Sequence, residues 1–518
     1  MNVADLFQAQ AEARPDAVAL VEGRGRRRRA VTFADLERLG AEGAGRLAHA
    51  GLAKGDAVLV LVPLSVELYV VLAAVLRLGL VAVLLDPGAG RAHVAACCRV
   101  LPPAAFVGVP KAHGLRLFVP GVRRIPLRFA VGGWVPGAKR WSRGGGACPV
   151  TPCAPDDPAL LTFTTGSTGA PKAAVRTHGF LRAQHRALAE ALGHEAGQVD
   201  LPTLPVFVLA GLASGLTSVL PEADLRRPGA VAPAPVLAQI EAEEVTRSAA
   251  SPAFFERLLG AEDLAPLARL RRLDTGGAPV FPDLLDRLQA AAPAAEVVAV
   301  YGSTEAEPIA ELPAASLTAS DRERVRTGSG LPAGRPVDTV RLRVIEDCWG
   351  TPIGPLSGTT FEALTCPPGT AGEIVVSGAH VLPGYLGGAG DAESKFEVGG
   401  VRWHRTGDAG TLETDGRLWL LGRCAAAVRD AHGTLYPLAV EAAAREVAGV
   451  RRSALVAAEG RRTLVVEAQD GFDDERLREA LAWAHLAAVL PVAAVPLDRR
   501  HNAKVDYPAL QVLLNRSG

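Results

Sequence analysis

Residues 160–175, LLTFTTGSTGAPKAAV, are the part of the chain best suited to bind an anion. An apolar strand is predicted to end in small hydroxyl residues and glycines, followed by Lys172. Glycines let backbone N–H groups approach a phosphate closely, hydroxyls donate to it, and the lysine adds positive charge. A flexible Gly/Ser turn is the alternative, which the preceding strand and the density of hydroxyl groups disfavour. The segment is not the P-loop of nucleotide hydrolases, because Ala173 stands where a Mg²⁺-binding Ser or Thr would be.

TTGSTGAPK resembles the phosphate-binding signature of the adenylate-forming enzymes, the superfamily of acyl-CoA synthetases, peptide adenylation domains and luciferases. Four further motifs of this superfamily match in the same order, over nearly the whole chain. They are DTGGAP (274–279), YGSTEAEP (301–308), WHRTGDAG (403–410) and LLGR, which ends at Arg423.

This resemblance implies that the cofactors are ATP and Mg²⁺. Tyr301 is expected to stack on adenine, Thr304 to touch the α-phosphate, Glu305 to hold Mg²⁺ and Asp408 to bind the ribose hydroxyls. The full set of residues expected to bind ATP is Thr164, Thr165, Gly166, Ser167, Thr168, Gly169, Lys172, Gly276, Gly277, Ala278, Pro279, Tyr301, Asp408 and Arg423.

The two acids also fit these roles on physical grounds. A carboxylate beside a triphosphate repels it unless a divalent cation lies between them, so Glu305 implies a metal ion. Asp408, in a predicted turn, can accept hydrogen bonds from two neighbouring hydroxyls. Each acid alone has an ordinary interpretation, a surface acid for Glu305 and a turn residue for Asp408, and the joint spacing of the motifs favours the functional one.

Lys504 lies near the C-terminus, in DRRHNAKVDYP (498–508). Alone it is a solvated charge, but adenylate-forming enzymes carry one catalytic lysine at this place, which contacts the α-phosphate and the carboxylate. Its charge would stabilise the transition state more than the ground state. His501 is a candidate base for a substrate hydroxyl, with a hydrogen-bonded structural histidine as the alternative.

Three stretches resemble one branch of the superfamily, the olefin-pathway β-lactone synthetases. They are HNAKVD around Lys504, residues 200–229 and residues 245–258. The resemblance implies that a β-hydroxy acid is activated as acyl-AMP and that its own hydroxyl then closes a β-lactone. Val208 stands where CoA ligases often have histidine, and Ala425 replaces the hinge aspartate or lysine of many relatives.

The acyl site is expected in FVLAGLASG (207–215), whose small residues leave room for an alkyl chain. Leu209, Leu212 and Leu216 have helical spacing, and at least two of them are expected in the core instead. The residues predicted to contact the substrate are Phe207, Val208, Gly211, Ser251 and Gly302. Two alternatives remain, an acyl-CoA or acyl-carrier ligase and a non-catalytic adenylate-binding scaffold.

Composition limits the remaining possibilities. The chain of 518 residues is long enough for two or more domains, and 55 basic residues balance 55 acidic ones, so no global field favours nucleic acid or an anionic membrane. Seven scattered cysteines lack zinc-site spacing and indicate reduced thiols. The start resembles no signal peptide, and the apolar stretch 56–88 is interrupted by charges. We expect a cytoplasmic enzyme without a membrane span, acting on a small β-hydroxy acid, with other enzymes of its pathway as possible partners.

An α/β fold is predicted, with a large N-terminal domain (1–422) of mixed and parallel sheets between helices and a small α+β C-terminal lid domain (423–518). Residues 56–87 indicate a strand to Val62, a helix over 65–78 and a second buried strand, the pattern of a parallel sheet covered on both faces. Further strands are expected at 245–249 and near TLYPLAVE, SALVAAE and TLVVEAQ. AEVVAVYGSTEAEP is expected to begin as a strand and to run into a Gly-Ser-Thr turn. Gly/Pro-rich segments 131–157 and 349–372 predict loops or joints.

Overall fold

The computed structural model describes all of the chain except residues 86–89, 142–145, 166–170, 459, 498–504 and 518. It forms two compact units. Unit 1 comprises Met1–Ala223, Ala234–Ala249 and Ala379–Asp391, and unit 2 comprises Asp224–Pro233, Ala250–Gly378 and Ala392–Gly518.

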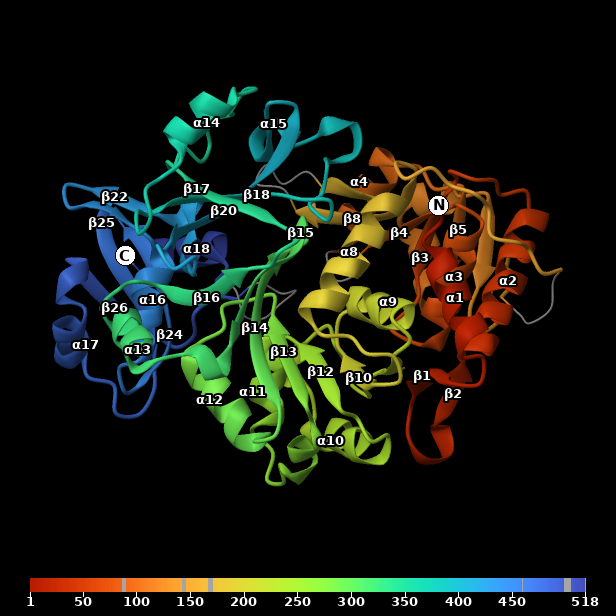
Figure 1. Cartoon of the computed structure of the whole chain (residues 1–518), viewed down its shortest axis with the longest axis horizontal. Helices are drawn as coiled ribbons and strands as arrows, with labels where there is room; N and C mark the ends of the chain where they lie inside the picture. Colours follow the sequence, from red (N-terminus) through yellow and green to blue (C-terminus); the bar gives the residue numbers. More distant parts are fainter. Residues whose placement is uncertain (86–89, 142–145, 166–170, 459, 498–504, 518) are drawn as a thin grey trace. The chain divides into compact units, whose positions relative to one another are not determined.

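Unit 1 contains a largely parallel sheet with the strand order β7-β6-β5-β3-β4-β8-β9 (Figure 1). Only β9 runs antiparallel, in a hairpin with β8. The strands are β3 (Ala57–Leu61), β4 (Val81–Leu84), β5 (Ala105–Gly108), β6 (Leu127–Ala130), β7 (Lys139–Arg140), β8 (Pro158–Thr165) and β9 (Pro171–Thr177).

Strand β3 confirms the predicted parallel sheet with two covered faces. It pairs in parallel with both β4 and β5. Val58 and Val60 pack into one hydrophobic cluster, while Leu59 and Leu61 pack into another. Successive side chains point to opposite faces of a strand, so both faces of β3 are buried. The helix expected over 65–78 is α3 (Val66–Arg77), capped by the Ser65 hydroxyl.

A second sheet of unit 1 has the order β2-β1-β11-β10-β12. Its strands are β1 (Val18–Glu22), β2 (Arg29–Thr32), β10 (Val199–Pro202), β11 (Thr217–Val219) and β12 (Arg247–Ala250). The strand predicted at 245–249 is thus present but shifted. The helices of this unit are α1 (Ala4–Ala13), α2 (Phe33–His49), α4 (Arg91–Val100), α5 (Pro110–His113), α6 (Leu115–Phe118), α7 (Pro120–Arg124), α8 (His178–Ala191), α9 (Pro205–Ala213) and α10 (Pro233–Ala242).

Unit 2 contains a mixed sheet with the order β13-β14-β15-β16-β21-β20-β18-β17, and β19 also pairs with β20. The strands are β13 (Arg272–Gly276), β14 (Glu296–Ser303), β15 (Ala306–Pro313), β16 (Leu331–Pro336), β17 (Arg341–Ile345), β18 (Gly372–Ser377), β19 (Lys395–Val398), β20 (Val401–Leu412) and β21 (Leu418–Arg423). The helices of this part are α11 (Pro252–Leu258), α12 (Pro282–Ala291), α13 (Ala319–Arg326), α14 (Gly358–Leu364) and α15 (Asp391–Ser394).

After Gly422 the chain forms a small α+β region, in agreement with the predicted fold class. Its strands are β22 (Val428–Asp430), β23 (Gly433–Leu435), β24 (Val450–Ala458), β25 (Arg461–Ala468) and β26 (Ala488–Val492), and its helices are α16 (Pro437–Arg445), α17 (Asp474–Ala480) and α18 (Tyr507–Ser517). The strands expected at SALVAAE and TLVVEAQ are confirmed as β24 and β25. The domain boundary at residue 422 stays a prediction.

Two local predictions were wrong. The strand expected over TLYPLAVE stops at Leu435, because Pro437 takes the first position of α16, where its missing N–H costs nothing. The segment 349–372 is not only loop, since Ser357 caps helix α14 by accepting a hydrogen bond from the Thr360 N–H.

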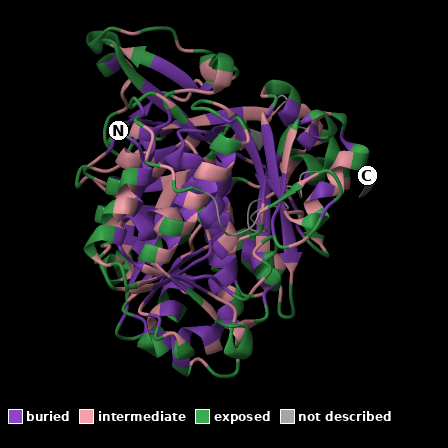
Figure 2. Ribbon diagram, turned by 90° about the vertical axis from the view of Figure 1, so that its right-hand side faces the viewer, coloured by how far each residue is buried: buried purple, intermediate pink, exposed green. Residues whose placement is uncertain are grey.

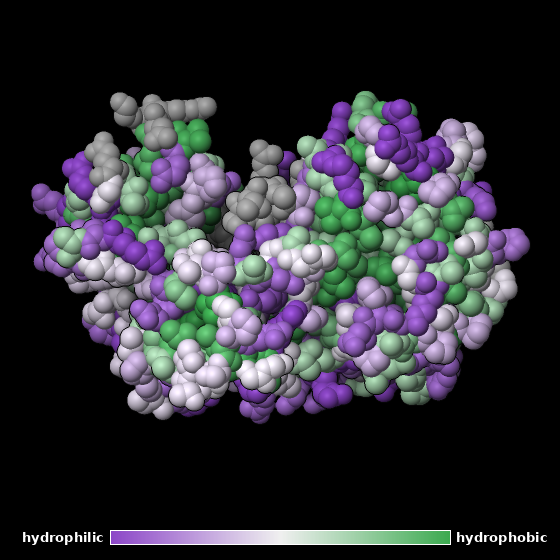
Figure 3. Space-filling model, turned by 90° about the horizontal axis from the view of Figure 1, so that it is seen from above, coloured by the Kyte–Doolittle hydropathy of each residue, from purple (hydrophilic) through white to green (hydrophobic). Residues whose placement is uncertain are grey.

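Burial follows the layered arrangement. Figure 2 shows the strands largely buried and the helices exposed on their outward faces. Figure 3 shows hydrophilic residues interspersed with hydrophobic ones on the face seen from above.

All seven cysteines lie within the described residues and are free. In the described part of the chain, every helix is too short or too polar to cross a bilayer.

Arg405 and Glu373 form a buried ion pair that joins β20 to β18, the neighbouring strand. The Arg405 Nη2 donates to Glu373 Oε2 at 2.6 Å, and neither side chain is exposed. Burial raises the pKa of Glu373, while its hydrogen bonds from Arg405 oppose the rise. Since β20 also carries Asp408, the pair fixes the strand that presents this acid.

Replacing one partner of this pair leaves a buried charge without compensation. We expect Arg405→Ala to lower the free energy of unfolding by about 3 kcal/mol, measured by urea denaturation. The matched control is Arg402→Ala on the same strand, whose ion pair with Glu397 is 47% exposed on both sides, and it should change stability by less than about 1 kcal/mol. Equal effects of the two substitutions would contradict this account of β20.

Candidate active site

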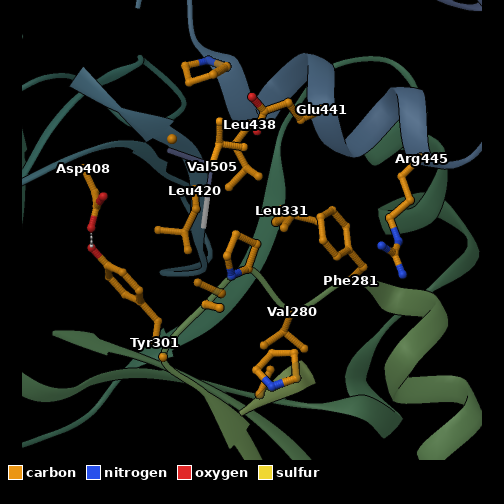
Figure 4. Close-up of a pocket in the computed structure, with 18 of the residues that line it drawn as sticks. Val280, Phe281, Tyr301, Leu331, Asp408, Leu420, Leu438, Glu441, Arg445 and Val505 are labelled. Atoms are coloured by element: carbon orange, nitrogen blue, oxygen red, sulfur yellow. Dashed lines mark hydrogen bonds between the residues drawn. The ribbon is translucent and has the colours of Figure 1, made fainter. Parts of the chain in front are cut away.

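A cavity of about 330 Å³ lies in unit 2 (Figure 4). It is bounded by the segment after β13, the end of β14, strands β16, β20 and β21, and helix α16. Seven residues predicted from the sequence to bind ATP or substrate line it: Gly277, Ala278, Pro279, Tyr301, Gly302, Asp408 and Arg423. Four separate sequence motifs therefore meet at one cavity.

Tyr301, Asp408 and Arg423 are connected at one end of the cavity. The Tyr301 hydroxyl donates to Asp408 Oδ2 at 2.9 Å, as the dashed line in Figure 4 marks. The Arg423 Nε lies 3.2 Å from the other carboxylate oxygen. Asp408 raises the pKa of Arg423, and burial, together with Asp408, raises the pKa of the Tyr301 phenol well above its usual value. The phenol is therefore a hydrogen-bond donor at neutral pH.

The register of two strands sets this geometry. Asp408 on β20 lies directly opposite Arg423 on β21. Thr406 supports both residues, because its hydroxyl accepts from the Asp408 N–H at 3.1 Å and its carbonyl accepts from Arg423 at 3.1 Å. The prediction that Asp408 lies in a turn was wrong: it is inside β20, and the glycines around it fit an irregular strand with a bulge between Ala409 and Gly410.

The predicted adenine-binding turn follows β13. Gly276 pairs with Val300, and a Cβ on Gly276 would lie 2.4 Å from the Val300 carbonyl oxygen. Gly277 has a φ of +81° and faces open space. Glycine at the first position thus allows close strand packing, and at the second it allows a left-handed backbone that leaves room beside the cavity.

Thr304 and Glu305 form the turn between β14 and β15. The expected Gly-Ser-Thr turn begins later than predicted, because Gly302 and Ser303 still belong to β14. The Ser303 hydroxyl accepts from the N–H groups of Glu305 and Ala306 at 3.3 and 3.2 Å and so fixes the turn. No cluster of three or more His, Cys, Asp or Glu side chains that could hold a metal occurs among the described residues.

The predicted phosphate-binding segment belongs to unit 1. Residues 166–170, including Gly166, Ser167, Thr168 and Gly169, lie outside the described residues. The strands on either side form the β8–β9 hairpin, in which Thr164 pairs with Lys172 and Thr165 with Pro171. The Lys172 Nζ lies 6.0 Å from the Tyr385 ring centroid, within cation–π range.

Helix α9 carries the residues predicted for the acyl site. Phe207, Val208 and Gly211 are all buried in unit 1, and Val208 belongs to its hydrophobic core. Leu212 and Leu216 are also buried, as expected for at least two of the three leucines. Ser251, the residue before α11 in unit 2, makes no side-chain cap to that helix. The substrate contacts of these residues stay predictions.

The two catalytic candidates near the C-terminus, Lys504 and His501, lie outside the described residues. The described residues on either side of this segment, Leu497 and Val505, form an isolated antiparallel bridge and both line the cavity. The next helix, α18, begins at Tyr507, which also lines the cavity.

The sequence interpretation missed one wall of the cavity, formed by α16. The cavity is lined here by Leu438, Glu441 and Arg445. Their spacing of i, i+3, i+7 is the feature of the sequence that could have predicted one face of a helix at this place. The Arg445 guanidinium lies 4.4 Å from the Phe281 ring centroid and pairs with Glu256 and Asp283 at 3.2 Å each. The cavity therefore changes from the polar Tyr301–Asp408–Arg423 group to an apolar middle and an arginine-bearing end.

Comparison with known proteins agrees with this arrangement. Residues 7–386 match the sequence model of the AMP-binding enzyme family. The chain belongs to this family, the adenylate-forming enzymes, and is an ATP-dependent, AMP-forming ligase.

Within the family, the chain is similar to the olefin β-lactone synthetases. It is 35% identical to the olefin β-lactone synthetase of Stenotrophomonas maltophilia and 32% identical to that of Xanthomonas campestris, and each alignment covers 99% of this chain and 97% of the relative. Among solved structures, the amide bond synthetase McbA of Marinactinospora thermotolerans matches with a TM-score of 0.80 at 24% identity, covering 99% of both chains. ATP-bound MatB of Rhodopseudomonas palustris gives a TM-score of 0.80 at 22% identity, also covering 99% of both chains. At these identities the two structures establish the fold alone.

Glu441 is a partly buried acid on the cavity wall. Its Oε1 accepts hydrogen bonds from the Leu455 N–H and the Tyr507 hydroxyl, each at 3.1 Å. Burial raises the pKa of Glu441 to about 7 from 4.5, and the two hydrogen bonds reduce the rise. The folded protein therefore favours the protonated acid.

This shift predicts a pH-dependent stability. The protonated acid stabilises the folded state fully below pH 4.5, and the contribution is lost as the pH rises through about 7. We expect Glu441→Gln, which keeps the same acceptor, to match the wild type near pH 4.5 and to exceed it by about 3 kcal/mol well above pH 7 in urea denaturation. Glu479→Gln, an exposed acid on α17, is the control and should change stability little at either pH. A constant difference between Glu441→Gln and the wild type would contradict the assignment.

Proposed function

We propose that the protein is a β-lactone synthetase that converts a β-hydroxy carboxylic acid and ATP into a β-lactone, AMP and pyrophosphate. The observation that carries the proposal is the cavity with the linked Tyr301–Asp408–Arg423 group, in a chain that aligns over 99% of its length with olefin β-lactone synthetases.

The nucleoside of ATP fits the polar end of the cavity. The Tyr301 ring lies on the cavity wall. Gly277 also lines the cavity and, without a side chain, leaves open space there. The Asp408 carboxylate already accepts one hydrogen bond and pairs with Arg423, and two carboxylate oxygens can accept about four hydrogen bonds in all. It therefore retains capacity for the ribose hydroxyls.

We propose that the triphosphate is bound by Thr164–Gly169, Lys172 and Thr304, with Mg²⁺ held through Glu305. Magnesium usually binds through one or two carboxylates together with substrate phosphates rather than in an all-protein cage. The lack of a larger acidic cluster among the described residues suits this mode. The ion would neutralise charge on the phosphates, and Ser303 would keep Glu305 in place through the turn.

In the first half-reaction, a carboxylate oxygen of the acid attacks the α-phosphorus and pyrophosphate leaves. We assign Lys504 to this step. Its neighbour Val505 lines the same cavity as Tyr301 and Asp408. A lysine near the α-phosphate would stabilise negative charge that develops in the transition state.

Lys504→Ala is therefore expected to lower the rate of adenylation by two or more orders of magnitude, a loss of about 3 kcal/mol of transition-state stabilisation. The affinity for ATP should change little, since the interaction strengthens only in the transition state. Pyrophosphate release and equilibrium ATP binding measure the two quantities. Near-normal turnover of this variant would refute the assignment.

In the second half-reaction, the β-hydroxyl oxygen attacks the acyl carbon, AMP leaves as the C–O bond to phosphate breaks, and the hydroxyl proton passes to a base. His501, three residues before Lys504, is our candidate for the base. The nucleophile belongs to the substrate itself, so positioning gives it a high effective concentration without a thiol acceptor, although ring strain offsets part of this advantage. Val208 on α9 stands where a CoA ligase often has histidine, which suits this route.

The fate of the acyl-adenylate distinguishes this function from that of an acyl-CoA ligase. With ATP, Mg²⁺ and a panel of 3-hydroxy acids, lactone and AMP should appear together by mass spectrometry in the absence of CoA. The same acids without the 3-hydroxyl group should stall as acyl-AMP, trapped as hydroxamates by hydroxylamine. The β-lactone proposal fails if no 3-hydroxy acid gives lactone and the deoxy acids become thioesters once CoA is added.

A further inference from the structure

One sector of unit 1 has a charge composition unlike the rest of the chain. Between Asp86 and Asp156 the sequence contains ten lysines and arginines and no aspartate or glutamate. At the chain average of 55 acids in 518 residues, about seven would be expected there. The balanced net charge of the whole protein hides this local excess, and the remaining residues carry ten more acids than bases.

The basic side chains of this sector that the structure describes form no ion pairs with carboxylates. Elsewhere the arginines commonly contact acids, as Arg28 contacts Glu243 and Arg405 contacts Glu373. Within the part of the chain that the structure describes, nine basic residues of the sector have no carboxylate partner: Arg91, Arg99, Lys111, Arg116, Arg123, Arg124, Arg128, Lys139 and Arg140.

The sector also exposes large hydrophobic side chains. Trp134 is 76% exposed and Leu117 is 70% exposed, the two highest values for large hydrophobic residues in the described part of the chain. Phe118 is 57% exposed, and Val100 is 43% exposed. Large hydrophobic side chains exposed together on a surface are typical of a site that binds a partner. Trp134, Leu117 and Phe118 therefore indicate such a site.

Contacts join the basic and the hydrophobic residues into one surface. Arg91 lies over the Phe118 ring at 4.0 Å from its centroid. Arg123 donates from Nη2 to the Leu117 carbonyl oxygen at 2.7 Å and from Nε to the Arg116 carbonyl oxygen at 3.0 Å. Arg116 in turn donates to the Pro136 carbonyl oxygen at 2.9 Å, which fixes the loop that carries Trp134 next to α6.

Sheet topology explains this grouping. Strands β5 and β6 are parallel, with Gly108 opposite Ala130. Their carboxyl ends therefore lie at the same edge of the sheet, where β5 leads into α5 and α6 and β6 leads into the Trp134 loop. A hydrophobic tip from each segment is thus presented on one rigid side of unit 1.

We propose that this surface docks the protein on an anionic lipid bilayer. We call it the docking face and define it by Arg91, Leu117, Phe118, Arg124, Trp134 and Lys139. Lysine and arginine attract anionic lipid headgroups, and tryptophan is favoured at the boundary between headgroups and hydrocarbon. Neither interaction requires a membrane-spanning helix, so the binding is peripheral and reversible.

Both halves of the docking face are needed to select a bilayer among anionic partners. Nucleic acid and acidic proteins offer the charge, but a liquid hydrocarbon boundary can also accept side chains as far exposed as Leu117 and Trp134 without a preformed pocket. The acid excess of the remaining residues opposes contact of other faces with an anionic membrane, so the charge distribution also orients the protein.

Vesicle co-sedimentation of the full-length protein, without ATP or acid, tests this proposal independently of catalysis. We expect binding to phosphatidylcholine vesicles containing about one-third phosphatidylglycerol, weakened by added sodium chloride, and little binding to phosphatidylcholine alone. The triple variant R91S/R124S/K139S should lower the partition coefficient by about tenfold or more. L117S/F118S/W134S should lower it to a similar extent.

The matched control is R26S/R27S/R186S, which removes three exposed arginines of unit 1 outside the sector and should bind like the wild type. A second readout needs no loss of binding: anionic vesicles should shift the tryptophan emission of the wild type to shorter wavelength, and Trp134→Phe should remove that shift while the protein still sediments. The proposal is refuted if the wild type stays in the supernatant with anionic vesicles, if the control loses as much binding as R91S/R124S/K139S, or if neutral vesicles bind the protein equally well.

Discussion

The carboxylate of Asp408 is the point on which the polar end of the cavity depends. It is held on β20, accepts the Tyr301 hydroxyl from β14 and pairs with Arg423 from β21, so one side chain connects three strands. A tyrosine and an arginine that are linked to the same acid cannot change orientation independently. The ring that is proposed to contact adenine and the acid proposed to contact ribose are therefore set in position before any ligand binds, which reduces the ordering that binding must supply.

The opposite, apolar part of the cavity has a different physical character. Val280, Leu331, Leu420 and Leu438 line it, and beyond them Arg445 lies over Phe281 (Figure 4). Glu441 lies on helix α16 between Leu438 and Arg445, and burial there favours its neutral form. A water-poor wall next to a charged end strengthens the electrostatic interactions at that end, because the effective dielectric constant is lower than in water.

The ordered motifs identified residues that line one cavity, because each motif is a local combination of residue types with a local cause. Gly276 and Gly277 illustrate this: one is required by strand packing and the other by a positive φ. The wall formed by α16 was missed because Glu441 and Arg445 acquire their roles only when a helix packs beside β21. Asp408 was placed in a turn because Gly407 and Gly410 surround it, yet pairing with β21 and β18 extended the strand through these glycines. Strand partners distant in sequence decided this position, and no local pattern contains them.

The same distinction between local and distant information applies to charge. Equal totals of acids and bases excluded a global field, and that inference is correct for the whole chain. It says nothing about a surface, because the screening length at physiological salt is about 8 Å and a partner senses only nearby charges. Parallel strands β5 and β6 bring Arg116 and the Trp134 loop to the same sheet edge, so a sector without acids becomes a continuous basic and hydrophobic face. The proposed substrate is a carboxylic acid, and if it carries an alkyl chain it partitions into membranes, so that an enzyme held at that boundary would meet it at a higher local concentration than in water.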